Sequence, residues 1–165
     1  LVALQAIRLK GAGKVIVIDL LESRLEMARQ MGADATIRAD DPDLMAKLLH
    51  ETGPEGADVA MEAVGVQSTI DLALSITRKG GALTLIGNVS PRVEFNLQSI
   101  VSREITLYGV CATNEFPDVV ELVAAGKINV DPFVSDYAHI EDGQAVFDRL
   151  YKGVPGNIRT VFVFD

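Results

Sequence analysis

The chain has 165 residues, of which 48% are hydrophobic and 23% charged, and this composition is that of one globular domain with a buried core. Its formal net charge of −8 and the lack of any Lys and Arg run argue against nucleic acid or an anionic membrane surface as a partner. A single cysteine, Cys111, excludes an internal disulfide, and no apolar run could span a bilayer, so we expect a cytoplasmic protein.

The first ten residues show a helical pattern that has no capping residue before it, and the chain does not begin with Met. We therefore expect that a segment precedes Leu1. The glycine-rich residues 11–13 end this helix.

From there to Cys111, strands and helices are expected to alternate. The predicted strands are 15–19, 35–38, 57–64, 82–86 and 105–110, and the predicted helices are 21–31, 41–53, 69–78 and 96–103. Strand 15–19 is apolar on both faces, as a central strand covered by helices must be. Helical crossovers make successive strands parallel, which predicts an α/β fold with one doubly wound, Rossmann-like parallel sheet.

Beyond Cys111 the rhythm changes. A helix is expected at 116–125, a strand at 133–137, a helix at 141–151 and a strand at 160–164. This tail need not extend the first sheet.

Asp19 stands at the carboxyl end of the first predicted strand, where open α/β sheets place ligands. An acid there can accept hydrogen bonds from both hydroxyls of an adenosine ribose and would repel a 2′-phosphate, which favours NAD over NADP. The alternative is an acid that only stabilises the start of the next helix, and the residue alone does not decide between them. Arg24 could curl back over the adenosine, although a solvated helix charge is the simpler interpretation.

Two further strands end in small residues. Val64-Gly65 and Ile86-Gly87-Asn88 would allow a backbone to approach a flat ligand, but an ordinary strand-to-helix turn is the simpler explanation of each one taken singly. Glu62 is an acid within an otherwise apolar strand, and we expect a paired polar strut there rather than a catalytic group. No catalytic residue or metal ligand is assigned within the chain.

The order and spacing of these motifs resemble the medium-chain dehydrogenase/reductase family over essentially the whole chain. The matching stretches are 13–19, 24–28, 31–35, 56–65, 80–87 and 157–161. Within that family, residues 102–109 are most similar to the zinc-type branch of sorbitol, galactitol-phosphate and threonine dehydrogenases.

The resemblance implies a cofactor site for NAD. The implied contacts are Asp19 and Arg24 with the adenosine ribose, Val64 and Gly65 on the adenine side, Ile86, Gly87 and Asn88 on the nicotinamide side, Val110 and Cys111 near the carboxamide, and Arg159 with the pyrophosphate. A surface charge beside the last strand is the alternative for Arg159.

The resemblance also implies hydride transfer between NAD(H) and a secondary alcohol or polyol, assisted by zinc. The family's zinc ligands, first strand and glycine-rich turn have no counterpart here and are expected upstream. We therefore expect residues 1–112 to form an incomplete NAD-binding domain and residues 113–165 to pack towards a catalytic domain outside the chain. The chain alone is expected to be inactive.

Three other interpretations stay open. A zinc-free, NADPH-dependent quinone or enone reductase belongs to the same superfamily, although Asp19 counts against it. A methyltransferase has a similar sheet, but the tail ending in Arg159 does not fit that class. A non-catalytic nucleotide-binding or oligomerisation module is the third, in which the edge strand Ile105–Val110 would pair with a second subunit. The resemblance to the dehydrogenase family likewise implies a homodimer or homotetramer through this edge strand.

Overall fold

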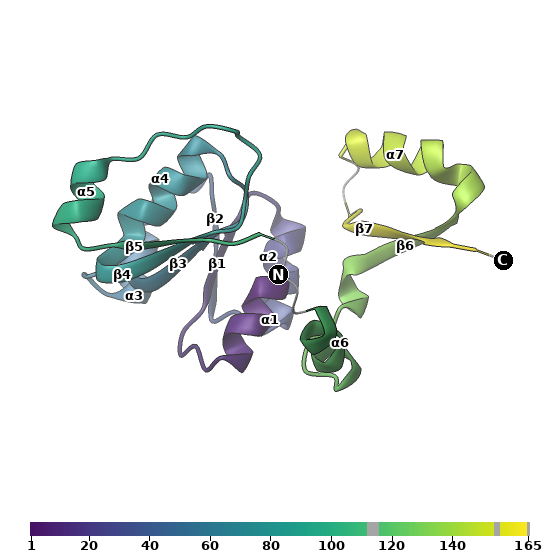
Figure 1. Cartoon of the computed structure of the whole chain (residues 1–165), viewed down its shortest axis with the longest axis horizontal. Coiled ribbons are helices and arrows are strands. Elements are labelled where there is room, and N and C mark those ends of the chain that lie inside the picture. Colours follow the sequence, from purple (N-terminus) through teal and green to yellow (C-terminus); the bar gives the residue numbers. More distant parts are fainter. Residues whose placement is uncertain (112–115, 154–155, 165) are drawn as a thin grey trace.

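The computed structural model of the chain describes residues 1–111, 116–153 and 156–164. Its first part contains α1 (Val2–Leu9), β1 (Ile16–Asp19), α2 (Glu22–Gln30), β2 (Ala35–Arg38), α3 (Leu44–Thr52), β3 (Ala57–Glu62), α4 (Gln67–Ile76), β4 (Thr77–Leu85), α5 (Leu97–Ser102) and β5 (Thr106–Gly109) (Figure 1). Its second part contains α6 (Phe116–Ala124), η1 (Asp131–Phe133), β6 (Val134–His139), η2 (Ile140–Asp142), α7 (Gly143–Tyr151) and β7 (Arg159–Val163). The predicted order of helices and strands is confirmed.

The strands of the first part are all parallel, as predicted, but they do not form one sheet. Strand β1 pairs with β2, while β4 lies between β3 and β5 in a separate three-stranded sheet. The expectation of a single sheet is wrong in this respect, because no ladder among the described residues joins the β1–β2 pair to β3. One side of β3 is occupied by β4, and its other side has no strand partner within the described part of the chain.

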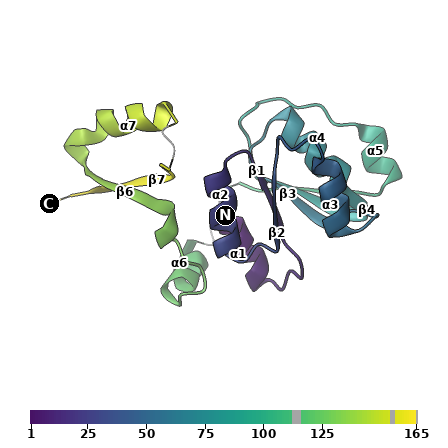
Figure 2. The same ribbon diagram turned by 180° about the vertical axis from the view of Figure 1, so that it is seen from behind.

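Strand β1 is covered by helices on both faces, which is the defining feature of a doubly wound fold. Val17 packs with α1 and α2 around the buried Leu4 and Ala28. Ile16 and Ile18 point to the other face and pack around the buried Ile37, Leu48 and Ile76, which belong to β2, α3 and α4. The alternation along β1 thus divides four helices between two layers, and Figure 2 shows the two helix pairs on different sides of the strands.

A third cluster lies under α4 and α5, where Leu74, Leu83 and Ile105 are buried together. Leu83 is completely inaccessible and sits in the middle of β4, the central strand of its sheet. The apolar packing of β4 therefore holds the three-stranded sheet to its helical layer.

Arg8 joins three chain segments that the sequence pattern did not connect. Its guanidinium donates to Ala12 O (3.1 Å) and Gly13 O (2.7 Å) after α1, and to Gly32 O (3.1 and 2.7 Å) after α2. It also forms an ion pair with Asp34, whose carboxylate accepts the N–H of Val15 at 2.6 Å. One guanidinium therefore provides hydrogen-bond donors for the main-chain carbonyls of two glycine-containing turns.

Several predicted boundaries are corrected. Arg78 lies in β4 and not in a helix, because β4 begins at Thr77, directly after α4, and runs through the glycine pair 80–81. A Cβ on Gly81 would lie 2.9 Å from the carbonyl oxygen of Asp58, so this glycine serves strand packing rather than a turn. Helix α3 begins at Leu44 because the carboxylate of Asp41 accepts the N–H of Asp43 and makes a turn before it.

The second part forms its own two-stranded parallel sheet, β6–β7, with α7 as the crossover helix. This confirms that the tail does not extend the first sheet, and Figure 1 shows the β6–α7–β7 unit standing beside the first part with α6 between them. The two parts are joined by a reciprocal pair, in which Gln5 Nε2 donates to Asn129 O (2.8 Å) and Asn129 N–H donates to Gln5 Oε1 (2.7 Å). The predicted domain boundary between residues 112 and 113 lies outside the described residues and stays a prediction.

Truncation of Leu83 tests the packing of the central strand. We expect Leu83→Ala to lower the free energy of unfolding by about 2–5 kcal/mol. The shorter side chain would leave a cavity in the core, since Leu83 is completely buried. Leu20→Ala is the matched control, since Leu20 is 57% exposed, and its effect should stay below about 0.5 kcal/mol. Denaturant titration without cofactor measures both, and equal losses would contradict the assignment of Leu83 to the core.

Acid titration tests the Asp34 contacts. Chiefly the N–H of Val15, and also Arg8, lower the pKa of Asp34 below its ordinary value. A lowered folded-state pKa stabilises the fold above the unfolded value of about 3.9, and this contribution is lost as the pH falls through the folded-state pKa. Asp34→Asn should therefore destabilise the protein at neutral pH, and the difference from wild type should shrink in acid. A difference that is independent of pH in urea titrations would contradict this.

Candidate cofactor site

The carboxyl ends of three strands lie level at one edge of the β3–β4–β5 sheet. The parallel register pairs Glu62 with Leu85 and Leu85 with Gly109, so the segments after these residues emerge side by side. Backbone bonds continue past the strands, since Val110 N–H donates to Leu85 O at 2.9 Å. The structure therefore brings together three of the predicted cofactor segments, which are Val64-Gly65, Ile86-Gly87-Asn88 and Val110-Cys111.

Gly65 and Gly87 are in direct backbone contact. A Cβ on Gly87 would lie 2.2 Å from Gly65 N, and a Cβ on Gly65 would lie 2.3 Å from Asn88 N. Gly65 also has a φ of +85°, which L side chains rarely adopt. These glycines are thus required by the approach of two chain segments to each other, a reason that the sequence pattern did not reveal.

Glu62 is buried beneath this contact, with only 3% of its surface exposed. Its carboxylate accepts the N–H groups of Val64 (2.8 Å) and Gly65 (2.9 Å from each oxygen) and the hydroxyl of Thr69 (2.7 Å). A buried carboxylate with three such donors is well satisfied without a cation. The sequence indicated a polar strut at Glu62, and the structure identifies its partners.

Asp19 and Arg24 form a separate pair at the end of β1, in the other sheet. Asp19 Oδ1 accepts the N–H of Leu21 at 2.9 Å, and Oδ2 lies 3.6 Å from Arg24 Nη1. Both side chains reach solvent, Asp19 with 26% and Arg24 with 48% of the side chain exposed.

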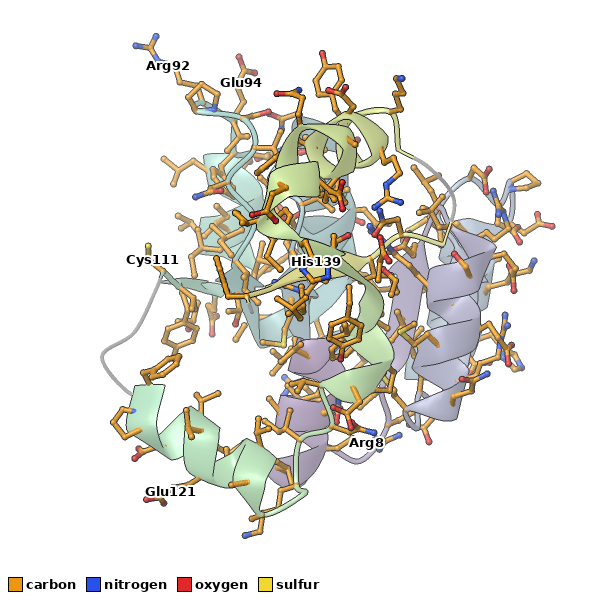
Figure 3. The ribbon with its side chains drawn as sticks, turned by 90° about the vertical axis from the view of Figure 1, so that its right-hand side faces the viewer. Arg8, Arg92, Glu94, Cys111, Glu121 and His139 are labelled. Carbon is orange, nitrogen blue, oxygen red and sulfur yellow. The ribbon has the colours of Figure 1, made fainter. Side chains whose placement is uncertain are left out.

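Two further residues that the sequence analysis assigned to the cofactor site are Arg159 and Cys111. Arg159 begins β7 in the third sheet and is exposed, and its main-chain N–H and carbonyl bond to the hydroxyl of Ser135 in β6. Cys111 is exposed and points outward (Figure 3). The structure thus places these two residues but does not test their predicted contacts with a cofactor.

The segment after Asn88 is held over the start of α4 by a contact that the sequence did not suggest. The side chain of Gln67 donates to Glu94 O and accepts from Glu94 N–H, both at 2.8 Å. Beside it lies an open hollow of about 1230 Å³ lined by Gln67, Asp71 and residues 91–96. Arg92 and Glu94 project from this segment away from the body of the molecule (Figure 3).

Arg103 explains part of the 102–109 motif in structural terms. Its guanidinium donates to Leu74 O at 2.6 Å and also to Thr77 O, so it caps the end of α4 from the end of α5. Gly80 N–H donates to Arg103 O at 2.8 Å. This motif residue stabilises the sheet and its helices, and it does not face the strand ends.

In the ranges that the structure describes, no group of three or more His, Cys, Asp and Glu side chains could hold a metal ion. Over the same ranges, no helix is both long and apolar enough to cross a membrane.

Comparison with known proteins identifies a family. The family model for zinc-binding dehydrogenases matches residues 1–125. Sorbitol dehydrogenase of Bacillus subtilis (strain 168) is 33% identical over 154 residues, which are 92% of this chain and 44% of that protein. The crystal structure of L-idonate 5-dehydrogenase from Escherichia coli has a TM-score of 0.87 at 26% identity and covers 98% of this chain and 46% of that one.

A putative zinc-binding dehydrogenase from Sinorhizobium meliloti 1021, solved bound to NADP, has a TM-score of 0.75 at 26% identity over 87% of this chain and 43% of that one. The chain spans less than half the length of these relatives. The resemblance to the zinc-type polyol dehydrogenases and the Rossmann-like α/β class are both confirmed by these matches. With three quarters of its residues matched by the family model, the chain belongs to the zinc-binding dehydrogenase family.

Proposed function

We propose that this chain is the cofactor-binding part of an oxidoreductase that transfers a hydride between NAD(H) and a secondary alcohol or polyol. The observation that carries the proposal is the set of level strand ends after β3, β4 and β5, in a fold whose β1 ends in the partly exposed carboxylate of Asp19. Relatives named sorbitol dehydrogenase and L-idonate 5-dehydrogenase support a polyhydroxylated substrate.

The residues present fit a dinucleotide. Asp19 Oδ2 carries no hydrogen bond among the described residues beyond the ion pair with Arg24, so it has lone pairs for the ribose hydroxyls. Val64 and Val110 expose apolar surface at the strand ends, against which flat rings can pack. Arg159 is proposed to reach the pyrophosphate, since a guanidinium matches its geometry. Bound NAD would supply the hydride acceptor, and this chain would bind and orient it.

NAD is proposed rather than NADP because of the charge on Asp19. A carboxylate at this position accepts hydrogen bonds from ribose hydroxyls and repels a 2′-phosphate. The relative from Sinorhizobium meliloti 1021 was solved bound to NADP, so the proposal of NAD for this chain rests on this one side chain.

Zinc is proposed to act in the part of the protein that this chain does not span. The described residues offer no ligand set, and no step of the reaction is assigned to a metal here. The open side of β3 supports a further proposal, that a strand outside this chain lies between β1 and β3 and joins the two sheets.

A homodimer or homotetramer is proposed to form through β5 in the cytoplasm. Within the part of the chain that the structure describes, strand β5 has a strand partner, β4, on one side only, and all four of its residues are exposed. An exposed parallel edge with Leu107, Tyr108 and Val110 on it offers both backbone pairing and apolar surface to a second copy.

Cofactor selectivity tests the function. The purified full-length protein should reduce NAD with sorbitol or L-idonate and bind NADH more tightly than NADPH. Asp19→Ser should weaken NADH binding by about 10- to 150-fold and reduce or reverse the preference, because the lost carboxylate bonds are worth about 1.5–3 kcal/mol. Asp58→Asn is the control, an exposed acid of β3 paired with Arg78. Tighter binding of NADPH by the wild type would favour the zinc-free reductase.

Edge-strand charge tests the assembly. Tyr108→Lys should shift the protein towards monomers in sedimentation velocity, because a lysine on an edge strand opposes pairing. Tyr137→Lys is the matched control, since Tyr137 of β6 is 66% exposed and Tyr108 is 56% exposed. The same dissociation in both variants, or in neither, would contradict assembly through β5.

A further inference from the structure

We propose that Glu62 is the positioning residue that holds the 64–65 turn and the 86–88 segment in register, so that one dinucleotide can contact both. This inference rests on the proposed function, because it requires a ligand that spans the two segments. Glu62 acts through its neighbours and does not itself touch the ligand, since it is 3% exposed.

The carboxylate fixes the first segment. Both of its oxygens accept the N–H of Gly65, and Oε1 also accepts from Val64 and from the hydroxyl of Thr69 on α4. A bond to an ionised acceptor is stronger than one to a neutral acceptor, so the turn after β3 is tied firmly to the start of α4. The hydrogen bonds to the Glu62 carboxylate thus fix the path of the main chain at Val64.

The backbone carbonyl of the same residue fixes the second segment. Glu62 O accepts the N–H of Ile86 at 2.8 Å and of Gly87 at 3.1 Å, beyond the last register pair of β3 with β4. The ladder then continues between the two segments, since Val89 N–H donates to Val64 O (3.3 Å) and Ser90 N–H donates to Gly65 O (2.8 Å). One residue therefore anchors both sides of the proposed site.

The backbone contact between Gly65 and Gly87 couples the positions of the two segments. Gly65 and Gly87 lie so close that even a methyl group on either would overlap the other backbone. A small displacement of the 64–65 turn must therefore move Gly87 and Asn88 as well. Loss of the carboxylate should change the spacing of the two segments more than the shape of either one.

Glu62→Gln replaces one acceptor oxygen by an NH₂ group, which would face the N–H of Gly65 or Val64 and cannot bond to it. Thr69→Val removes one donor and leaves the carboxylate in place, while Thr69→Ser keeps the hydroxyl. These three variants weaken the hydrogen bonding of the Glu62 carboxylate to different degrees. The two Thr69 variants remain informative if Glu62→Gln fails to fold. Asp58→Asn, on the same strand but exposed, serves again as the control.

The measurement compares NADH with ADP-ribose, which lacks only the nicotinamide base, by titration of the full-length protein. Glu62→Gln should weaken NADH about tenfold or more but ADP-ribose less than about twofold, because only the whole dinucleotide must match both segments. Thr69→Val should weaken NADH by a smaller factor, and Thr69→Ser should bind like the wild type.

Equal weakening of NADH and ADP-ribose in Glu62→Gln would overturn the inference, because a merely structural residue would affect both ligands alike. Wild-type affinity for NADH in Thr69→Val would also overturn it. Failure of the wild type to bind NADH would instead overturn the proposed function, and the two failures are therefore distinguishable.

Discussion

The candidate site depends on the parallel register of β3, β4 and β5, which brings three chain segments to one edge at the same level. Parallel strands all end in the same direction, so the segments that leave their carboxyl ends become part of one surface. In this chain, those segments carry two glycines in backbone contact and a buried carboxylate beneath them. The geometry of the site is thus a property of the sheet and its strand ends rather than of any one loop.

Helices cover both faces of β1, which belongs to the other sheet of the first part. Val17 packs towards α1 and α2, while Ile16 and Ile18 pack towards α3 and α4, so β1 is partly buried from two sides. Polar anchors then fix the ends of the helices, with Arg8 after α1 and Arg103 after α4. Apolar packing supplies most of the stabilisation, and these arginines donate hydrogen bonds to main-chain carbonyls at the helix ends.

The second part of the chain follows the same logic on a smaller scale. Strands β6 and β7 are parallel and joined by α7, but they pair with each other and with no strand of the first part among the described residues. Gln5 and Asn129 connect the two parts through backbone-like hydrogen bonds. Arg159 lies at the start of β7, so its proposed contact with a pyrophosphate depends on how this part sits against the first.

The sequence by itself determined the order of the elements and the α/β class, because apolar periodicity and glycine punctuation depend on residues close in the chain. Its motif stretches also carried the resemblance to the family. It also indicated Asp19, since an acid directly after an apolar strand is a local pattern. Tertiary structure alone decided that the strands divide into separate sheets, that Gly65 and Gly87 pack on each other, and that Glu62 bonds to the turn beside it and to Thr69. These features depend on residues from different strands and helices coming within a few ångströms, and no spacing along the chain encodes such a distance.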